Sequence, residues 1–451
     1  MLIWKAQTVN VNIASLRYRC LLPLRYLNQL GIESTVCSNQ EPLEVSAQTE
    51  AIIFVKSFRD QDVITCERAY QLGVPIILDL CDNIFIDGYA PNSCYVPAQN
   101  FQVMARRATA IVTTGEALKA AVEDFLRPLV GEVYVVAIPD GSETLDDIDY
   151  SLRMTQWRRL EGWVRQKAKQ KTIEKQRGLH AILSACSQQK NRAQRWFNRF
   201  SDLLGSHKSE QLIESEQLIE SSSVAQLEST TEICKKSKKA TSQPIPLVPD
   251  PWPKAAKGVK TVLWFGNHGA KYGNFGMLNV LDVVPALHAI SQSLPLRLVV
   301  VSNSREKYEQ HIEPLPFETT YLRWHPRKMY EYIRASDVVI VPNSQSAFSI
   351  CKSANRAVLA LSQGTPVVAS HTPALDLLSE CIWVDDWEAG LRDYLLNPSV
   401  VKAHLARAQQ VIEANFSGEV IAQQWLKLLN QVLPSASRST KPLAERAVLR
   451  P

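Results

Sequence analysis

Short apolar runs alternate with longer amphipathic runs in two separate stretches of the chain. The apolar runs are rich in Val, Ile and Leu, which predicts strands that are buried on both faces. In the first stretch they lie at residues 2–5, 34–37, 51–55, 75–80, 110–113 and 133–138. In the second stretch they lie at residues 261–265, 296–301, 320–324, 337–341, 366–369 and 382–384. This alternation predicts an α/β fold with two parallel sheets and right-handed crossovers, and hence two Rossmann-like domains that face one another.

Amphipathic helices are predicted between these strands, because apolar residues recur there at spacings of three and four. In residues 16–30 this spacing is followed by Gly31, which is a common helix stop. In the second stretch the same spacing predicts helices at residues 277–292, 326–335, 352–362, 400–415 and 418–433.

Residues 151–257 interrupt the alternation. Residues 151–200 carry thirteen Lys and Arg against two Glu, together with three Trp, and predict a basic helical segment. A tandem hexapeptide at residues 209–220 and five Pro within residues 244–253 predict a mobile linker that ends in a stiff spacer. We therefore expect one domain at residues 1–150, an insertion at 151–257, a second domain at 258–435 and a disordered tail at 436–451.

The composition restricts the class of protein. Among 451 residues, 45% are hydrophobic and 21% are charged, which is typical of globular domains. The nine Cys are scattered without a Cys-x-x-Cys pair, which favours reduced thiols over a disulfide framework or a zinc site. Neither a signal peptide nor an apolar run long enough to span a bilayer is present. We expect a cytoplasmic protein without a cofactor or a bound metal.

Most of the positive charge lies in one segment. The net charge of the chain is +5, whereas thirteen Lys and Arg against two Glu give residues 151–200 a net charge of +11. Basic residues interleaved with Trp can lie on an anionic membrane surface, grip a nucleic acid, or pack against protein. Nucleic acid is the least favoured of these partners, and a membrane contact would be peripheral, at the inner face.

The segment from Asp337 to Ser370 carries the strongest chemical signal. A predicted strand ends at Pro342, a polar loop follows, and a helix is predicted to begin near Lys352. Lys352 and Asn355 would then share one face of the first helical turn, with Arg356 next to them. A helix N-terminus, an ammonium group and an amide together suit a diphosphate. The alternative is that Lys352 is simply solvated.

This segment resembles the donor-binding segment of the GT-B glycosyltransferases, in the branch called glycosyltransferase group 1 or family 4. The resemblance rests on Asp-Val-Val-Ile-Val-Pro at 337–342, Gly-Thr-Pro-Val-Val-Ala at 364–369, and Ala335 and Asp337 after a short helix. It also rests on Val-Leu-Trp-Phe-Gly at 262–266 and on Ile-Pro-Asp-Gly at 138–141. It covers roughly residues 1–150 and 258–435, and it implies a nucleotide-diphosphate-sugar donor.

A glycine-rich loop at residues 266–276 follows the first strand of the second domain, and Gly permits close backbone approach to phosphate. The alternative is a tight surface loop. With the resemblance, the expected donor-side residues are Gly266, Asn267, His268, Gly269, Lys271, Lys352, Ser353, Asn355, Arg356, Gly364 and Thr365.

The chain departs from the family at one place. Many retaining members carry two Glu eight positions apart before the Gly-Thr-Pro turn, and the second of them holds the donor ribose. The corresponding residues here are Cys351 and Leu359, and neither accepts a hydrogen bond as a carboxylate does.

On the first domain, Asp79 and Asp82 end a buried strand, so at least one carboxylate should emerge at the strand end. Asp82 is the candidate catalytic residue, as a general base or an orienting carboxylate. The alternative is a helix cap or turn stabiliser. Ser15, Arg17 and Arg19 are further acceptor-side candidates, either for an anionic acceptor or for the donor diphosphate, or they form an exposed helical face.

The resemblance therefore implies a glycosyltransferase that moves a sugar to a glycan, lipid-linked or small-molecule acceptor, in cell-envelope or extracellular polysaccharide synthesis. If it is retaining, the departing diphosphate assists deprotonation of the acceptor. Two alternatives stay open: a nucleotide-sugar epimerase, and a catalytically inactive GT-B module that binds a glycan or a partner.

Overall fold

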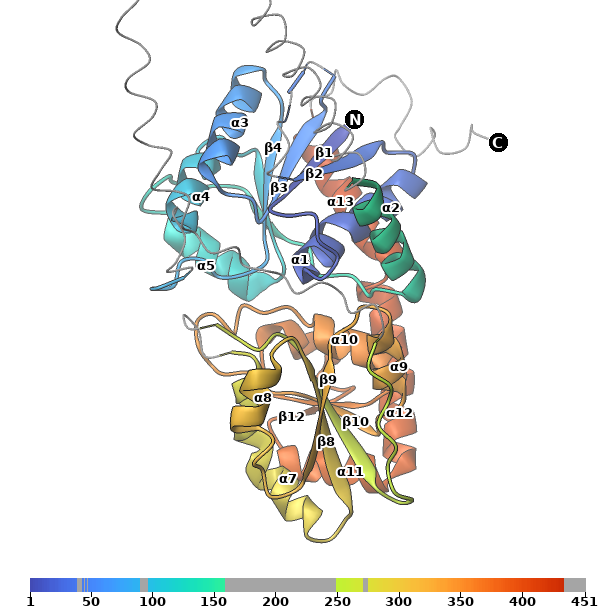
Figure 1. Cartoon of the computed structure of the whole chain (residues 1–451). Coiled ribbons are helices and arrows are strands. Elements are labelled where there is room, and N and C mark those ends of the chain that lie inside the picture. Colours follow the sequence, from blue (N-terminus) through green and yellow to red (C-terminus); the bar gives the residue numbers. More distant parts are fainter. Residues whose placement is uncertain are drawn as a thin grey trace, which may run out of the picture. The chain divides into compact units, whose positions relative to one another are not determined.

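The computed structural model describes residues 1–38, 43, 45–46, 48–89, 96–158, 249–270 and 275–433. Within this part of the chain the strands form two six-stranded parallel sheets (Figure 1). The predicted strands are confirmed, with ends that differ by no more than two residues. The predicted basic and linker segments between residues 159 and 248, Lys271 and the tail lie outside the described residues.

The first sheet has the strand order β2-β1-β3-β4-β5-β6. Its strands are β1 (Leu2–Ala6), β2 (Ser34–Ser38), β3 (Ala51–Val55), β4 (Ile76–Leu80), β5 (Ala110–Thr113) and β6 (Val135–Ala137). Apolar residues of α3 (Asp60–Gln71), α4 (Pro97–Ala105) and α5 (Glu116–Leu126) cover one face. The other face packs against α1 (Ala14–Leu16), η1 (Arg17–Leu21) and α2 (Leu22–Gln29). Both faces are buried, which explains the nearly continuous apolar strands.

The second sheet has the order β12-β11-β10-β7-β8-β9. Its strands are β7 (Lys260–Phe265), β8 (Leu296–Ser302), β9 (Glu318–Arg323), β10 (Val338–Val341), β11 (Val367–Ala369) and β12 (Trp383–Val384). One face packs on α9 (Lys328–Arg334), α10 (Asn355–Ser362), η4 (Pro373–Leu378) and α12 (Pro398–Asn415). The other packs on η3 (Met277–Val283), α7 (Val284–Ser291), α8 (Arg305–His311) and α11 (Trp387–Leu396).

Each sheet has one point where the winding of the chain reverses. In the first sheet this switch point lies between β1 and β3, and in the second between β7 and β10. The loops that follow two such strands leave in opposite directions and open a crevice at their carboxyl ends. Ligands of open α/β sheets bind there.

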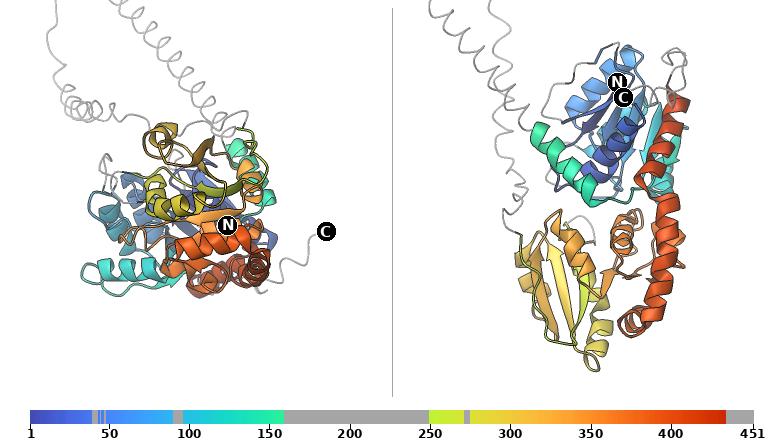
Figure 2. Two further views of the ribbon diagram at one scale, coloured as in Figure 1. Left: turned by 90° about the horizontal axis from the view of Figure 1, so that it is seen from below. Right: turned by 90° about the vertical axis from the view of Figure 1, so that its right-hand side faces the viewer.

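The C-terminal helix α13 (Gly418–Val432) returns to the first sheet, although α12 belongs to the second (Figure 2). Trp425 packs edge-on against Trp4, with 4.9 Å between the ring centroids. The chain is closely packed where it passes from α12 to α13, because a Cβ atom at Gly418 would lie 2.2 Å from the ring of Tyr26. The helix at residues 145–158 also contributes to both cores, with Ile148 on the second and Tyr150 on the first. The two halves therefore share packing at several places.

The segment before β7 packs on the second half. Tyr332 donates a hydrogen bond to the carbonyl oxygen of Asp250, and the ring of Trp252 stacks on that of Tyr332 at 5.8 Å. Arg297 donates to the carbonyl oxygen of Pro253 at 3.0 Å. The last residues of the predicted proline-rich spacer are thus held against β8, β9 and α9.

Three helix predictions differ from the structure. The helix predicted at residues 277–292 begins as a 3₁₀ helix, η3, and continues as α7. The helix predicted at residues 16–30 contains a π-helical turn, η1, and the helix predicted to start at Lys352 starts at Asn355. Before Asn355, Ser346 and Ser349 form a local turn, in which the Ser346 hydroxyl accepts a hydrogen bond from the backbone N–H of Ser349. Serine hydroxyls compete with helical hydrogen bonds in this way. Lys352 consequently lies in a loop and not on a helical face shared with Asn355.

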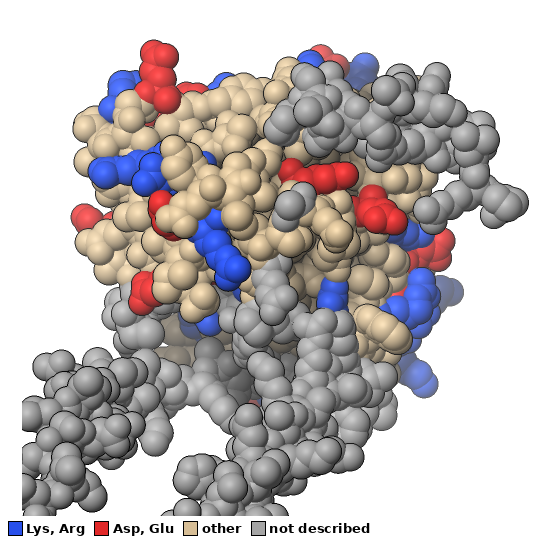
Figure 3. Space-filling view, turned by 90° about the horizontal axis from the view of Figure 1, so that it is seen from above, with Lys and Arg blue, Asp and Glu red and all other residues tan. Residues whose placement is uncertain are grey.

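One face of the described residues shows no single dominant charge. On the face in Figure 3, Lys and Arg lie among Asp and Glu and uncharged residues. No helix among the described residues has the length and apolarity that would be needed to cross a membrane.

Candidate functional site at the strand ends

Arg356 lies at the switch point of the second sheet. It occupies the first turn of α10 and donates from Nη2 to Oδ1 of Asn343, just beyond β10, at 2.8 Å. A Cβ atom on Gly266, directly after β7, would lie 3.5 Å from Nη1 of Arg356. The guanidinium therefore spans the loops that follow the two strands of the switch point.

Arg356 is not charge-compensated within the described ranges. No acidic side chain pairs with it among the described residues. Burial disfavours the charged form and lowers the pKa of Arg356 to about 10. A partly buried guanidinium whose hydrogen-bond partner in the described part of the chain is a neutral amide can bind an anion with little competition.

The glycine-rich loop after β7 closes on itself beside Arg356. Gly269 and Gly276 have φ values of 93° and 98°. A Cβ atom at Gly269 would lie 2.3 Å from the carbonyl oxygen of Phe275, so a side chain there would clash. Asn267 and His268 stabilise the loop: Oδ1 of Asn267 accepts from the N–H of Gly269 at 2.8 Å, and Nδ1 of His268 lies 2.7 Å from Oδ1 of Asn303.

Lys352 is not simply solvated, contrary to one of the two sequence-based alternatives. Its ammonium group forms an ion pair with Oδ1 of Asp82, in the other half of the molecule. The same group lies 3.9 Å from the ring centroid of Phe348 and 5.2 Å from that of Phe275. An ammonium over aromatic rings gains a further electrostatic attraction.

Asp82 pairs with two lysines at once. Its Oδ1 accepts from Lys352, its Oδ2 accepts from Lys56, and its side chain is 13% exposed. Burial alone would raise the pKa of Asp82, but the ammonium groups of Lys352 and Lys56 outweigh burial and lower it well below its usual value. Because Asp82 is ionised and tightly paired at neutral pH, it is a weak general base and is better suited to orienting neighbouring groups.

Lys56 is a site residue that the sequence analysis missed. It directly follows β3, at the switch point of the first sheet, and its φ of 48° is in the left-handed region. Burial would lower the pKa of Lys56, but the carboxylate of Asp82 raises it well above its ordinary value. The available signal was a charged residue directly after a buried strand, the same signal that identified Asp82. Left-handed backbone in a non-glycine residue is a common companion of functional positions.

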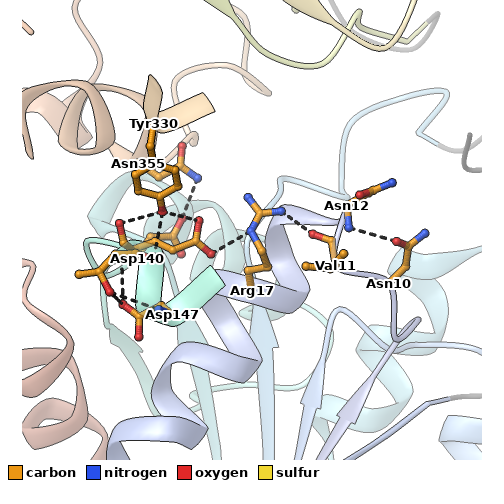
Figure 4. Close-up of polar contacts among 10 residues, drawn as sticks. Asn10, Val11, Asn12, Arg17, Asp140, Asp147, Tyr330 and Asn355 are labelled. Atoms are coloured by element: carbon orange, nitrogen blue, oxygen red, sulfur yellow. Dashed lines mark hydrogen bonds and ion pairs between the residues drawn. The ribbon is translucent and has the colours of Figure 1, made fainter. Parts of the chain in front are cut away.

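Asp140 also joins the two halves, through a hydrogen bond with Asn355 (Figure 4). Its Oδ2 accepts hydrogen bonds from Oγ of Ser353 at 2.6 Å and from Nδ2 of Asn355 at 3.3 Å. Its Oδ1 accepts from Nη1 of Arg19 at 3.3 Å. Ser353 and Asn355, both predicted on the donor side, are therefore positioned by a carboxylate from the first half.

Arg19 and Asp79 lie too deep to contact an acceptor. Nη2 of Arg19 donates to Oδ2 of Asp79 at 2.6 Å, and the side chains are only 1% and 0% exposed. Burial raises the pKa of Asp79 even though Arg19 opposes this shift. This pair supports the first sheet and places Asp140, so the structure gives these two candidates a structural role.

Arg17 also joins the two halves. It donates from Nε to Oε1 of Glu143 at 2.8 Å and from Nη1 to the carbonyl oxygen of Val11 at 2.6 Å (Figure 4). Its guanidinium carbon lies 5.3 Å from the ring centroid of Trp324, and Tyr330 donates to the carbonyl oxygen of Glu143 at 3.0 Å. Arg17 is buried and does not form an exposed helical face.

Ser15, Gly364 and Thr365 complete the predicted set. Ser15 is partly buried in α1. Gly364 has a φ of 78° and ends the turn after α10, while Thr365 is buried and donates to the carbonyl oxygen of Ile333 at 2.8 Å. The last two residues hold the turn between α10 and β11.

The positions that carry the family's two Glu are core positions here. Cys351 is 5% exposed and Leu359 is 7% exposed. Sγ of Cys351 lies 3.9 Å from Nδ2 of Asn83, which also donates to the carbonyl oxygen of Ala347 at 3.0 Å. No group of three or more His, Cys, Asp or Glu that could hold a metal ion occurs among the described residues.

Residues 259–412 match the family described as Glycosyl transferases group 1. This match covers the second sheet and supports an enzyme, a transferase. A search of curated proteins finds no match.

Among solved structures, HepE from Anabaena in complex with UDP is similar, with 13% identity and a TM-score of 0.50 over 95% of this chain and 99% of that chain. A trehalose 6-phosphate synthase from Burkholderia multivorans has 12% identity and a TM-score of 0.45, over 86% of this chain and 72% of that chain. A mutant of TarM from S. aureus has 10% identity and a TM-score of 0.44, over 84% and 55%. The likeness to HepE spans nearly the whole of both chains and confirms the GT-B fold that the resemblance implied.

Proposed function

We propose that this protein transfers a sugar from a nucleotide-diphosphate-sugar donor, with the donor diphosphate bound where β7 and β10 end. The observation that carries the proposal is Arg356: a partly buried guanidinium that none of the described carboxylates pairs with, between the loops of the switch point. The segment that contains it also matches a sugar-transferring family.

Several further groups support an anionic ligand at this position. The free N–H groups at the start of α10 carry partial positive charge, and they lie beside Arg356. Lys352 precedes the same helix and adds an ammonium group. Arg356 is thus the principal diphosphate ligand in our proposal, and Lys352 is the second.

A nucleoside diphosphate is the ligand to test first. HepE, the similar protein from Anabaena, was crystallised with UDP. Titration with several nucleotides and their sugar conjugates determines which base and which sugar this protein binds.

On the acceptor side we propose that Asp82 orients the reacting groups and does not take up the proton. Its low pKa makes it a poor base, and its two ammonium partners keep it in place. The departing diphosphate, held by Arg356, would then accept the proton of the acceptor hydroxyl. The acceptor is a glycan, a lipid-linked sugar or a small molecule, and the reaction would belong to polysaccharide synthesis in the cytoplasm.

A second candidate is a module that binds the donor without turnover. Burial of Cys351 and Leu359 in the core favours it, because no carboxylate stands where the family holds the donor. Other polar groups near Arg356 would have to replace those contacts in an active enzyme.

Calorimetric titration of the full chain with UDP, GDP, ADP and their sugar conjugates tests both candidates. We expect one nucleoside diphosphate to bind and its sugar conjugate to be hydrolysed slowly, since water can replace the acceptor. Binding without any release of sugar, even with oligosaccharides added, would favour the second candidate. Failure of every nucleotide to bind would contradict the donor site itself.

A further inference from the structure

Three side chains expected to meet the donor diphosphate already contact carboxylates from the other half of the molecule. Lys352 pairs with Asp82, while Ser353 and Asn355 donate to Asp140. Asp82 follows β4 and Asp140 follows β6, so both carboxylates come from the first sheet's loops. Arg356 differs, because none of the described acidic side chains pairs with it.

The two carboxylates differ in what else they hold. Asp140 is also paired with Arg19, which is buried with Asp79, so withdrawing Asp140 would disturb an ion-pair network inside the first half. Among the described residues, Asp82 is paired with Lys56 and Lys352, and it keeps some contact with solvent. If Lys352 turned to another anion, Asp82 would still be paired with Lys56.

We propose, on the basis of the function proposed above, that Asp82 is an internal competitor of the donor diphosphate. It occupies the ammonium group of Lys352 until a diphosphate takes its place, and it returns when the diphosphate leaves. Lys56 makes the exchange possible, because it keeps Asp82 paired while Lys352 is engaged elsewhere. Asp82 thereby limits the affinity for the nucleoside diphosphate product and favours its release.

The charges near the site agree with this exchange. Lys56 and Lys352 together outnumber Asp82 by one positive charge, and Arg356 adds another. In this proposal a diphosphate engages both Arg356 and Lys352, whereas a monophosphate held by Arg356 leaves the pair between Lys352 and Asp82 intact. The competition should therefore affect diphosphates and spare monophosphates.

The test is calorimetric titration of the full chain with UDP and UMP, in the parent and in Asp82→Asn. We expect the variant to bind UDP about tenfold more tightly, which corresponds to about 1.4 kcal/mol, and to bind UMP as the parent does. Asp87→Asn is the matched control, since it removes the same charge from an exposed position in the same loop. It should change neither affinity by more than about twofold. If the parent prefers GDP or ADP, that diphosphate and its monophosphate replace the uridine pair.

The possible results separate this inference from the function on which it rests. If the parent binds the diphosphate and Asp82→Asn binds it equally or more weakly, Asp82 is not a competitor, although the donor site stands. Equal tightening for UDP and UMP, or the same gain in Asp87→Asn, would reveal a general charge effect and overturn the inference. If neither the parent nor Asp82→Asn binds any nucleoside diphosphate, both the proposed function and the inference are wrong. Should Asp82→Asn not fold, Asp82→Ser is titrated in its place and judged by the same results.

Discussion

The switch points of the two sheets have different charge balances. At the first, Lys56 is neutralised by Asp82, which also pairs with Lys352. At the second, Arg356 donates to the amide of Asn343, lies close to Gly266 and has no acidic partner among the described residues. A balanced cluster is stable by itself and can position groups, whereas an unbalanced cation is stabilised by an incoming anion. Two similar sheets can therefore take different roles because the charges at their strand ends are balanced in one and unbalanced in the other.

The largest effect on stability is expected in the first half of the molecule, at the buried pair of Arg19 and Asp79. Arg19→Met should lower the free energy of unfolding by about 3–5 kcal/mol, because it leaves Asp79 and Asp140 without their buried partner. Urea unfolding followed by circular dichroism measures the loss. Arg107→Met is the control, since its pair with Glu67 is half exposed and should contribute far less to stability than the buried pair. Similar losses in the two variants would contradict the structural role of Arg19.

At the second switch point, replacement of Arg356 should weaken diphosphate binding but stabilise the fold. Arg356→Gln should weaken diphosphate binding by about 100-fold, as expected for the loss of a charge-assisted contact worth about 3 kcal/mol. The same change should raise the free energy of unfolding by about 1 kcal/mol, because it removes a desolvated charge that lacks a counter-ion. Calorimetry and urea unfolding measure the two effects.

Arg334→Gln provides the control for Arg356, because Arg334 is exposed on α9 and should affect neither quantity. Unchanged diphosphate binding in Arg356→Gln would locate the donor elsewhere and remove the contrast between the switch points.

Lys352 pairs with Asp82 of the first half and precedes α10 of the second half. Its replacement should therefore have an intermediate effect on diphosphate binding. Lys352→Ala should weaken diphosphate binding by about tenfold, less than Arg356→Gln, because part of its interaction with the ligand replaces an existing bond to Asp82. Binding of the bare nucleoside, which has no phosphate, should not change. Lys328→Ala on α9 is the control, and an equal loss there would indicate a long-range charge effect.

The smallest effect is the pH dependence of the free energy of unfolding that comes from Asp82 and its two lysine partners. Since the pKa of Asp82 is lowered in the folded protein, its pairing stabilises the fold above the ordinary Asp value of about 4 and is lost as pH falls below it. The difference in unfolding free energy between the parent and Asp82→Asn should therefore shrink between pH 6 and pH 3. Asp79 and Glu143 have raised pKa values, which give the opposite sign, but both proteins contain them and their effects cancel in the difference. A difference that stays constant with pH would contradict the ionised, lysine-paired state.

The sequence by itself determined both sheets. Each strand of a parallel sheet covered on both faces is a short apolar run, so its identity is written in adjacent residues and needs no distant contact. The resemblance also located the segment around Arg356, because its motifs are local in sequence. Helix starts were less well determined: Lys352 lies outside α10, since the Ser346 hydroxyl holds the backbone N–H of Ser349 in a local turn before it.

Only the tertiary structure decided which charges are paired. Asp82 and Lys352 are 270 residues apart, and Asp140 meets Ser353 across 213 residues. No local pattern distinguishes Arg19, which is paired and buried, from Arg356, which pairs with no acidic side chain that the structure describes. Electrostatic energy depends on distance and burial, and these quantities exist only when the loops of the two sheets have come together. The sequence therefore indicated where the chemistry lies, and the fold decided which side chains are available to perform it.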